Sequence, residues 1–429
     1  MLTGLSSFHT FGTLSSCYTF AVAINPYSPG AGTDPPVLAG RDAQLALVDS
    51  AAARAEGGLD VTPLILTGLR GMGKTVLLHE ARSRLDKRGW GTTYLEGRKS
   101  LDAEDATRLL IAEVERHLGA GRRLLRSSRK ILSSVGGVNV GVGPAGGTIG
   151  VQRTAGTQDS SDTSLISALR LLGRAAREEG RGFALFLDEL QTLRRRDLSI
   201  LIRSLSSLRG LPVVFVGAGL PYLPAELAAA STYAERFNYA VVDWLPAGDV
   251  REALVPPARD SGHAWTGDGY ESVYRLSHGY PYFVQLYASE SWDHAERTGS
   301  EEIGKKAVRA AEPRVRSRVD VGLYAARYDR ATPSEQRYLQ AMARLWQESS
   351  GQSASARRRR PLEEAAGSVE RVRSGDVARA LDQPLTAVGP IRDRLIRKGL
   401  IHAPQHGVIA FSVPGFADYV LRRVDTEEL

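Results

Sequence analysis

The sequence predicts an α/β fold in which helices cover both faces of a parallel β-sheet. Segments of helical periodicity, such as Ala103–Leu118 and Thr163–Glu179, alternate with short apolar runs of strand length. Alternation of this kind is typical of parallel strands joined by helices. A glycine-rich loop follows the first apolar run, and two carboxylates follow the third. The runs that predict strands are Val61–Leu66, Thr92–Glu96, Phe183–Leu187, Val213–Val216 and Ala240–Val242.

The first apolar run leads directly into the glycine-rich loop, and a helix follows. The loop has the P-loop pattern G-x-x-x-x-G-K-T, in which glycines let the backbone N–H groups point inward around a phosphate. Lys74 would reach the β and γ phosphates, and the Thr75 hydroxyl would hold Mg²⁺. A chance glycine-rich turn would lack this strand and helix. ATP or GTP is therefore expected to bind at Gly68, Leu69, Arg70, Gly71, Met72, Gly73, Lys74, Thr75 and Val76.

The third apolar run ends in two carboxylates, Asp188 and Glu189. An apolar strand ending this way would otherwise leave charge at a sheet edge for no gain, so a helix N-cap is a weaker interpretation of Asp188. We interpret the pair as a Walker B motif, in which Asp188 holds Mg²⁺ through its water shell. Glu189 would orient the attacking water, because phosphoryl transfer depends mostly on positioning and charge stabilisation.

Length and composition favour a cytoplasmic enzyme of several domains. A chain of 429 residues exceeds the size at which one core usually stops growing, so two or three domains are expected. With 42% hydrophobic and 24% charged residues, the chain can bury a sizeable core. The single cysteine, Cys17, excludes a disulfide framework. No apolar run approaches the roughly 20 residues that a membrane helix requires, so no membrane contact is expected.

Two segments are expected to lie outside the regular fold. Residues 1–24 are predicted to form a disordered extension, or to reflect a start chosen too far upstream. They lack the positive region of a secretion signal, because no Lys or Arg precedes Arg41. The long interval between Thr75 and Asp188 predicts an insertion, and a glycine-rich stretch fills 133–158. We expect a mobile surface hairpin there, with contact to DNA or a neighbouring subunit as the alternative.

The C-terminal region has the pattern of a separate module. A helix is expected to start at Thr332-Pro333, and the low-complexity stretch Glu348–Ala366 is expected to form a mobile loop. Two further helices are predicted over Ser374–Leu381 and Thr386–Lys398, and a β-hairpin follows them. A helix-turn-helix followed by a hairpin predicts a winged helix.

The second of these helices is amphipathic. Val388, Ile391 and Leu395 would face inward, while basic side chains face outward. Winged helices most often bind duplex DNA through the second helix and the wing, although some bind protein. The net charge of +7 permits binding to nucleic acid. The residues expected to contact DNA are Arg392, Arg394, Arg397, Lys398 and, in the hairpin turn, His406.

Several segments together resemble the AAA+ ATPases. Within that superfamily the chain is most similar to replication-initiator ATPases of the origin-recognition type, in a bacterial branch. The resemblance covers roughly residues 25–297 and the C-terminal hundred residues. It is carried by the two Walker motifs together with Pro35–Asp42, Val216-Gly217-Ala218-Gly219, Glu235-Arg236-Phe237 and Gly279-Tyr280-Pro281.

The resemblance implies roles for further residues. Leu38 to Arg41 would lie beside the adenine, and Pro281 would belong to a helical lid over the nucleotide. Arg236 would be an arginine finger offered to a neighbour's nucleotide, with an ordinary surface arginine as the alternative.

Two departures from the family pattern imply slow turnover. Gly217 and Ala218 stand where these initiators usually place a polar sensor residue, and Tyr282 stands where the lid commonly has arginine. The Gly-x-Pro lid also resembles that of the signal-transduction (STAND) NTPases, which use ATP as a slow switch.

These features predict an AAA+ core at 25–244, a helical lid at 245–315 and a winged-helix domain at 325–429. The predicted function is that of a slow ATPase, using ATP and Mg²⁺, whose nucleotide state controls binding to duplex DNA. Self-association of the ATP-bound form is expected, because an arginine finger acts in a neighbour's site. The alternatives are a STAND-like signalling or scaffold ATPase whose winged helix binds protein, and an accessory ATPase of a mobile element.

Overall fold

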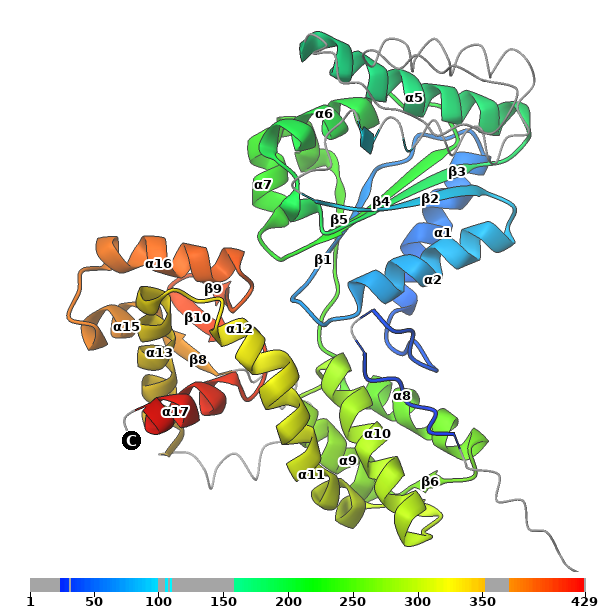
Figure 1. The fold of residues 1–429 in the computed structure, drawn as a ribbon. Coiled ribbons are helices and arrows are strands. Elements are labelled where there is room, and N and C mark those ends of the chain that lie inside the picture. The colour runs from blue at the N-terminus through cyan, green and yellow to red at the C-terminus, as the bar shows by residue number, and fades with distance from the viewer. Residues whose placement is uncertain are drawn as a thin grey trace, which may run out of the picture.

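The structure is a computed structural model that describes residues 24–30, 32–98, 105–106, 109, 158–351 and 370–427. It contains an α/β unit, a helical unit, and a smaller C-terminal unit (Figure 1). Some predicted segments lie outside the described residues. These are the extension at 1–24 apart from Ile24, the insertion at 133–158 apart from Gln158, most of the helix predicted over Ala103–Leu118, and most of the loop predicted over Glu348–Ala366.

The α/β unit contains the predicted sheet of five parallel strands. Their order across the sheet is β2-β3-β4-β1-β5. The first strand begins at Leu64 rather than at the predicted Val61, since Pro63 has no backbone N–H to donate to a ladder. The loops that follow β1, β3 and β4 meet at the carboxyl edge, where open α/β sheets bind ligands. The strands are β1 (Leu64–Thr67), β2 (Gly91–Glu96), β3 (Phe183–Asp188), β4 (Val213–Gly219) and β5 (Asn238–Val241).

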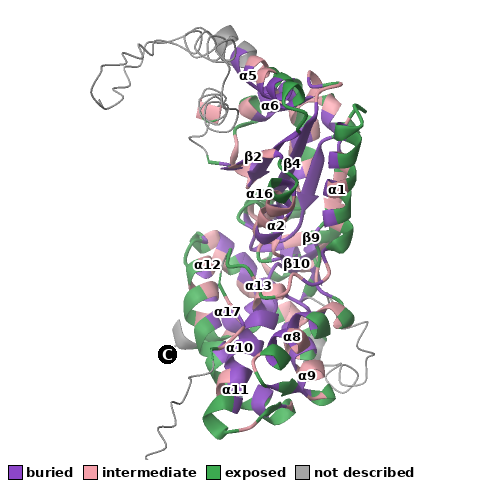
Figure 2. Ribbon diagram, turned by 90° about the vertical axis from the view of Figure 1, so that its right-hand side faces the viewer, coloured by how far each residue is buried: buried purple, intermediate pink, exposed green. Residues whose placement is uncertain are grey.

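Helices cover both faces of this sheet, and each face has its own apolar core. Successive strand residues point to opposite faces, so Leu66 and Phe186 join one core while Ile65 and Leu185 join the other. Figure 2 shows the strands buried between helices whose outer surfaces are exposed. The first core lies against α1 (Asp42–Glu56) and α2 (Lys74–Lys87), and the second against α5 (Gln158–Glu178), α6 (Arg195–Ser206) and α7 (Leu223–Ala230).

The helical unit follows β5. Its last long helix, α11, continues through a π-helical segment, η3, into α12, which leads to the C-terminal unit (Figure 1). No helix among the described residues is long and apolar enough to cross a membrane. The elements are α8 (Ala247–Asp260), β6 (Ala264–Trp265), α9 (Gly267–Ser277), α10 (Pro281–Thr298), β7 (Glu302–Ile303), α11 (Lys305–Val319), η3 (Asp320–Ala325) and α12 (Ala326–Tyr328).

The C-terminal unit is compatible with the predicted winged helix. Its three antiparallel strands have the order β8-β10-β9. Val388 and Leu395 are buried, as the amphipathic pattern predicts. The short strand β8 was not predicted, because three residues give no periodic signal. The elements are α13 (Pro333–Gly351), β8 (Arg371–Arg373), α15 (Ser374–Ala380), α16 (Leu385–Arg397), β9 (Ile401–Gln405), β10 (Val408–Phe411) and α17 (Phe416–Glu427).

Candidate nucleotide-binding site

The glycine-rich loop connects β1 to α2 at the carboxyl edge of the sheet. Gly71 and Gly73 have φ angles of 84° and 85°, a region that side chains with a Cβ rarely adopt. The Lys74 ammonium donates hydrogen bonds to the carbonyls of Gly68 at 2.9 Å and Leu69 at 2.8 Å. Burial lowers the pKa of Lys74 to about 8, although the charges of Glu189 and Asp188 oppose this shift. The carbonyls of the loop therefore fix the position of the Lys74 ammonium.

Asp188, at the end of β3, lies next to Thr75 of the loop. The Thr75 hydroxyl donates to one Asp188 carboxylate oxygen at 2.6 Å, and the Tyr94 hydroxyl donates to the same oxygen at 3.2 Å. Asp188 is only 2% exposed. A carboxylate beside a hydroxyl is a donor set that suits Mg²⁺, so the residues present fit this ion. Tyr94 was not predicted as a site residue, because it lies on a strand 94 positions from Asp188.

Glu189 lies in an unusual backbone conformation. Its φ angle is 50°, in the left-handed region that few non-glycine residues occupy. Its carbonyl oxygen accepts hydrogen bonds from the backbone N–H of Thr192 at 2.9 Å and from the Thr192 hydroxyl at 2.8 Å. The Gln191 amide donates to the Glu189 carboxylate. Gln191 was also missed from the sequence.

The two residues interpreted as a missing sensor lie inside the sheet. Gly217 and Ala218 are buried in β4. A Cβ on Gly217 would lie 2.3 Å from a Leu190 methyl carbon, so a larger residue there would displace the core. Packing against Leu190 therefore explains the absence of a side chain at Gly217.

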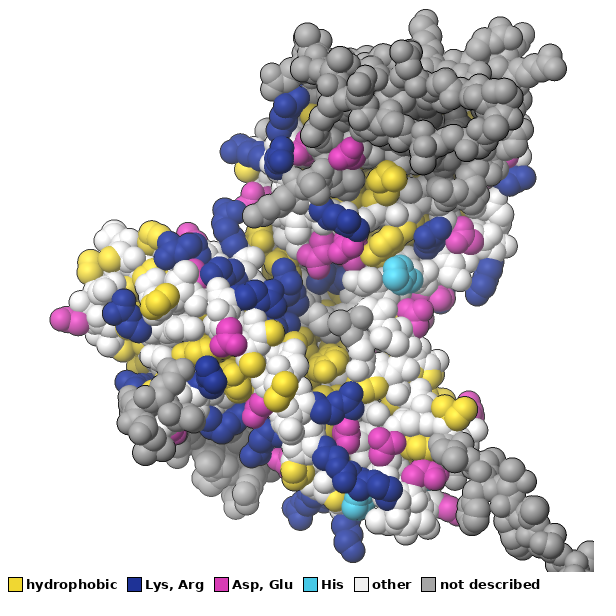
Figure 3. Space-filling view, in the orientation of Figure 1, with side chains coloured by type: hydrophobic (Ala, Val, Ile, Leu, Met, Phe, Trp, Pro, Cys, Tyr) yellow, Lys and Arg dark blue, Asp and Glu magenta, His cyan; other side chains and the backbone are white. Residues whose placement is uncertain are grey.

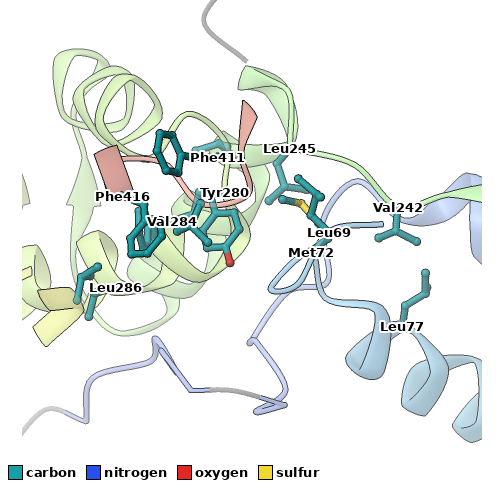
Figure 4. Packing of buried hydrophobic residues seen from close by; sticks show 14 of the residues in the cluster. Leu69, Met72, Leu77, Val242, Leu245, Tyr280, Val284, Leu286, Phe411 and Phe416 are labelled. Atoms are coloured by element: carbon teal, nitrogen blue, oxygen red, sulfur yellow. The ribbon is translucent and has the colours of Figure 1, made fainter. Parts of the chain in front are cut away.

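The helical unit contacts the loop through Tyr280. This buried side chain donates a hydrogen bond from its hydroxyl to the Arg70 carbonyl at 2.8 Å. A Cβ on Gly71 would lie 2.0 Å from that hydroxyl, which is a second reason for glycine at this position. Figure 4 shows Leu69 and Met72 of the loop near Leu245 and Tyr280.

The residues on either side of Tyr280 belong to the same turn. The Gly279 carbonyl accepts from the Leu245 N–H at 2.9 Å, and Pro281 is the first residue of α10. Tyr282 is half-buried, and its ring lies 5.9 Å from that of Phe283. The Gly-Tyr-Pro segment thus lies against the glycine-rich loop, and Tyr280 is its contact residue.

The segment before α1 contacts the glycine-rich loop through Arg41. Arg41 is 4% exposed, and its guanidinium donates to the carbonyls of Met72 at 3.0 Å and Asp243 at 2.8 Å. Burial lowers the pKa of Arg41, against the opposing charges of Asp249 and Asp243. Leu38 packs against the first apolar core. Arg41 therefore ties the loop to the segment that follows β5.

Arg236 is the last residue of the short helix η2 (Thr232–Arg236), and Phe237 separates it from β5. The side chain is exposed, and its guanidinium lies 5.6 Å from the centre of the Tyr233 ring. A guanidinium at this distance from an aromatic face gains a modest cation–π attraction.

The basic residues predicted to contact DNA have several different partners. Arg394 and Lys398 bind the buried carboxylate of Glu335, at 3.2 Å and 2.6 Å. Burial tends to raise the pKa of Glu335, but hydrogen bonds from Lys398 and Thr332 outweigh it and the net shift is downward. Arg392 pairs with its neighbour Asp393 at 3.1 Å. His406 is exposed in the β9–β10 turn.

Arg397 connects the C-terminal unit to the α/β unit. Its guanidinium lies 3.0 Å from a Glu226 carboxylate oxygen on α7, and its carbonyl accepts from the Tyr222 hydroxyl at 3.4 Å. A Cβ on Gly399 would lie 3.1 Å from the Arg70 Nε, which has no hydrogen-bond partner among the described residues. Figure 3 shows Lys and Arg side chains gathered where the two units meet.

Sequence comparison identifies the α/β unit. Residues 37–216 match the family model of the AAA ATPase domain, and this stretch contains both the glycine-rich loop and the acid pair. This stretch is an AAA ATPase domain. The match confirms the predicted AAA+ fold and ATP hydrolysis. Residues 321–420 match the model of a domain of unknown function, DUF8462. No curated protein matches the sequence.

Three solved structures illustrate the similarity of this chain to known folds. Cdc6p from Pyrobaculum aerophilum is 16% identical, covering 93% of this chain and 97% of its own, with a TM-score of 0.41. The Aeropyrum pernix Orc1 protein in complex with DNA is 16% identical, with coverages of 92% and 95% and a TM-score of 0.42. The Thermotoga maritima RuvB Holliday junction branch migration motor is 14% identical, with coverages of 86% and 91% and a TM-score of 0.43. At these scores we draw no conclusion from the likeness.

Proposed function

We propose that this AAA ATPase is a switch whose nucleotide state controls duplex DNA binding by its C-terminal domain. In this proposal Lys74, Thr75 and Asp188 hold MgATP, and Glu189 polarises the attacking water. The Mg²⁺ would neutralise charge on the β and γ phosphates. The backbone N–H groups of residues 68–76 would surround the phosphates, while Leu38, Arg41 and Pro281 would border the nucleotide.

The proposed functional units are those that the sequence predicts. The core would comprise residues 25–244, the lid 245–315 and the DNA-binding module 325–429. Arg236 would act in a neighbour's site, so ATP would favour self-association. Its exposure at the end of η2 supports this role, because a finger must reach another subunit.

The contact between the P-loop and the C-terminal domain supports the switch. Gly399 packs beside Arg70 of the P-loop. Arg397, two residues before Gly399, pairs with Glu226 of α7. Phosphate binding would draw the P-loop around its ligand and change the position of Arg70. A shift of Arg70 would loosen the packing of Gly399 and with it the Arg397 ion pair. ATP would thereby release the end of α16, because a ligand shifts an equilibrium toward the state it binds better.

Docking and DNA binding would compete for the same cation. Arg397 cannot pair with Glu226 and a phosphate at full strength at once, so DNA would favour the released state. Arg394 and Lys398 are held by Glu335 within the C-terminal domain, and we assign them a smaller part in DNA binding than Arg392, Arg397 and His406.

The test is a titration of fluorescent duplex DNA with the full chain, followed by anisotropy, with and without a non-hydrolysable ATP analogue. DNA affinity should rise with the analogue and fall steeply with salt. The double variant Arg392→Ala, Arg397→Ala should weaken binding on every duplex tried, because phosphate contacts dominate affinity. The matched control removes two exposed arginines of α11, Arg309→Ala and Arg314→Ala. Equal loss in both double variants, or no response to the analogue, would refute the proposal.

A second candidate is a signalling or scaffold ATPase. The ion pairs of α16 with Glu226 and Glu335 favour it, because they use the basic face for contacts within the chain. ATP-dependent oligomerisation without retention on DNA at moderate salt would select this function. An accessory ATPase of a mobile element would share the DNA-binding behaviour of the first candidate.

A further inference from the structure

Gln191 bridges the Walker B glutamate and the end of β4. Its amide nitrogen donates to the Glu189 carboxylate, and its amide oxygen accepts from the Leu220 backbone N–H at 3.1 Å. Leu220 directly follows β4, the strand that carries no polar sensor side chain. One side chain from the turn η1 (Leu190–Thr192) therefore satisfies both ends of its amide inside the site.

Two glycines leave room for the hydrogen bonds of Gln191 and Glu189. A Cβ on Gly219 would lie 2.6 Å from the Gln191 amide oxygen, and a Cβ on Gly97 would lie 2.6 Å from the Glu189 carbonyl oxygen. The left-handed conformation of Glu189 is held by two hydrogen bonds from Thr192 to that carbonyl. Strained conformations persist where surrounding contacts over-determine them, and they concentrate at functional sites.

We propose that Gln191 is the positioning residue for Glu189 and supplies the polar contact that β4 lacks. This inference rests on the proposed role of Glu189. During hydrolysis the water oxygen bonds to the γ-phosphorus while the bond to the β–γ bridging oxygen breaks, and Glu189 accepts the water proton. The Gln191 amide holds one carboxylate oxygen and leaves the other for the water. The hydrogen bond from the Leu220 N–H to the Gln191 amide oxygen fixes the orientation of the amide. The amide nitrogen, and not the oxygen, therefore faces the Glu189 carboxylate.

Removal of the donor should slow turnover without affecting nucleotide binding. A hydrogen bond to a charged group is worth about 1.5–3 kcal/mol, so Gln191→Ala should lower kcat roughly 10- to 150-fold. The affinity for a fluorescent ATP analogue should stay within twofold of wild type, because Lys74 and Thr75 are unchanged. The control Gln44→Ala removes a glutamine that donates to the Val241 carbonyl at 2.8 Å in the same domain, and it should keep the wild-type kcat.

Gln191→Glu gives a readout that a purely structural role would not move. The glutamate has the same shape but donates only when protonated. The measured quantity is the kcat of the variant divided by the kcat of wild type at the same pH. This ratio should be low at neutral pH and should approach one as the pH falls to about 5. The reference pKa of a glutamate carboxyl, about 4.3, places the return of the donor toward this acidic range.

A double-mutant cycle separates this inference from the proposed function. Gln191→Ala should have little further effect in a Glu189→Gln background, because the residue acts through Glu189. Wild-type kcat in Gln191→Ala, or full additivity with Glu189→Gln, would overturn the inference while leaving the ATPase assignment intact. If Glu189→Gln hydrolyses ATP at the wild-type rate, the proposed role of Glu189 fails first.

Discussion

The Arg397 guanidinium at the end of α16 lies 3.0 Å from the Glu226 carboxylate on α7, so the C-terminal domain is docked on the AAA ATPase domain by a cation predicted to bind DNA. The same helix end places Gly399 beside Arg70 of the P-loop. The apolar core beneath α1 and α2 also continues into the helical unit and the C-terminal domain, where Phe411 and Phe416 belong to it (Figure 4). The nucleotide site and the basic helix are therefore parts of one packed structure.

Glu226→Ala should strengthen DNA binding in the absence of nucleotide. The change removes the partner of Arg397, and an ion pair of this exposure is worth about 0.2–1 kcal/mol, or up to about fivefold in Kd. The measurement is anisotropy of a labelled duplex at fixed salt. Glu271→Ala, which removes one acid from the Arg275 ion pair on α9, is the control and should leave Kd unchanged. Unchanged affinity in Glu226→Ala would mean that docking does not restrain DNA binding.

Lys74→Ala and Glu189→Gln should separate binding from hydrolysis. Lys74 would contact phosphate directly, so its loss should abolish binding of a fluorescent ATP analogue. Glu189 would act only on the water, so Glu189→Gln should keep the wild-type affinity and lower kcat by at least about 100-fold. Wild-type ATP affinity in Lys74→Ala would contradict the assignment of the P-loop lysine.

ATP turnover of the dilute protein should be slow and should rise with protein concentration. An isolated chain is expected to turn over below roughly 1 s⁻¹, the lower end of the usual enzyme range. In the proposed function, Arg236 would stabilise the transferring phosphoryl group only when assembly brings it to a neighbour's site. Arg236→Ala should therefore erase the rise and leave ATP affinity unchanged. A fast rate that is independent of concentration and survives Arg236→Ala would show that one chain forms a complete site.

Stability should decline between about pH 6.5 and pH 4 because of His402. Burial lowers the pKa of His402 to about 4, Arg371 adds repulsion, and Asp243 opposes the shift. The unfolded chain then binds the proton more readily than the folded chain, so the contribution is complete above about pH 6.5 and is lost as the pH falls toward 4. The loss is at most about 3 kcal/mol.

Urea unfolding of His402→Gln at pH 7 and pH 4.5 is the measurement. The variant should lose less stability between these two pH values than wild type does, since glutamine does not titrate. Equal losses in the two proteins would show that His402 is not a main source of the acid sensitivity. His406→Gln, in the exposed turn of the same hairpin, is the control.

The local parts of the site were predictable from the sequence. The spacing of a strand, a loop and a helix predicts the proposed role of Gly68 to Thr75, and the end of an apolar strand predicts the proposed roles of Asp188 and Glu189. The five strands and the helix-turn-helix pattern follow from periodicity for the same reason. Each of these signals depends on residues within one or two neighbouring elements, so no long-range contact is needed to interpret them.

Only the tertiary structure decided which side chains complete the site and which cations are already paired. Tyr280 reaches the Arg70 carbonyl across 210 positions, and Lys398 binds Glu335 across 63. Gln191 is close to Glu189 in sequence, yet its role depends on Leu220, which β4 brings beside it. Amphipathic periodicity could place Lys398 on the polar face of its helix, but the packing of α16 against α13 determined that this face binds a buried carboxylate. Pairing of distant side chains depends on how the elements pack, and a local pattern does not contain that information.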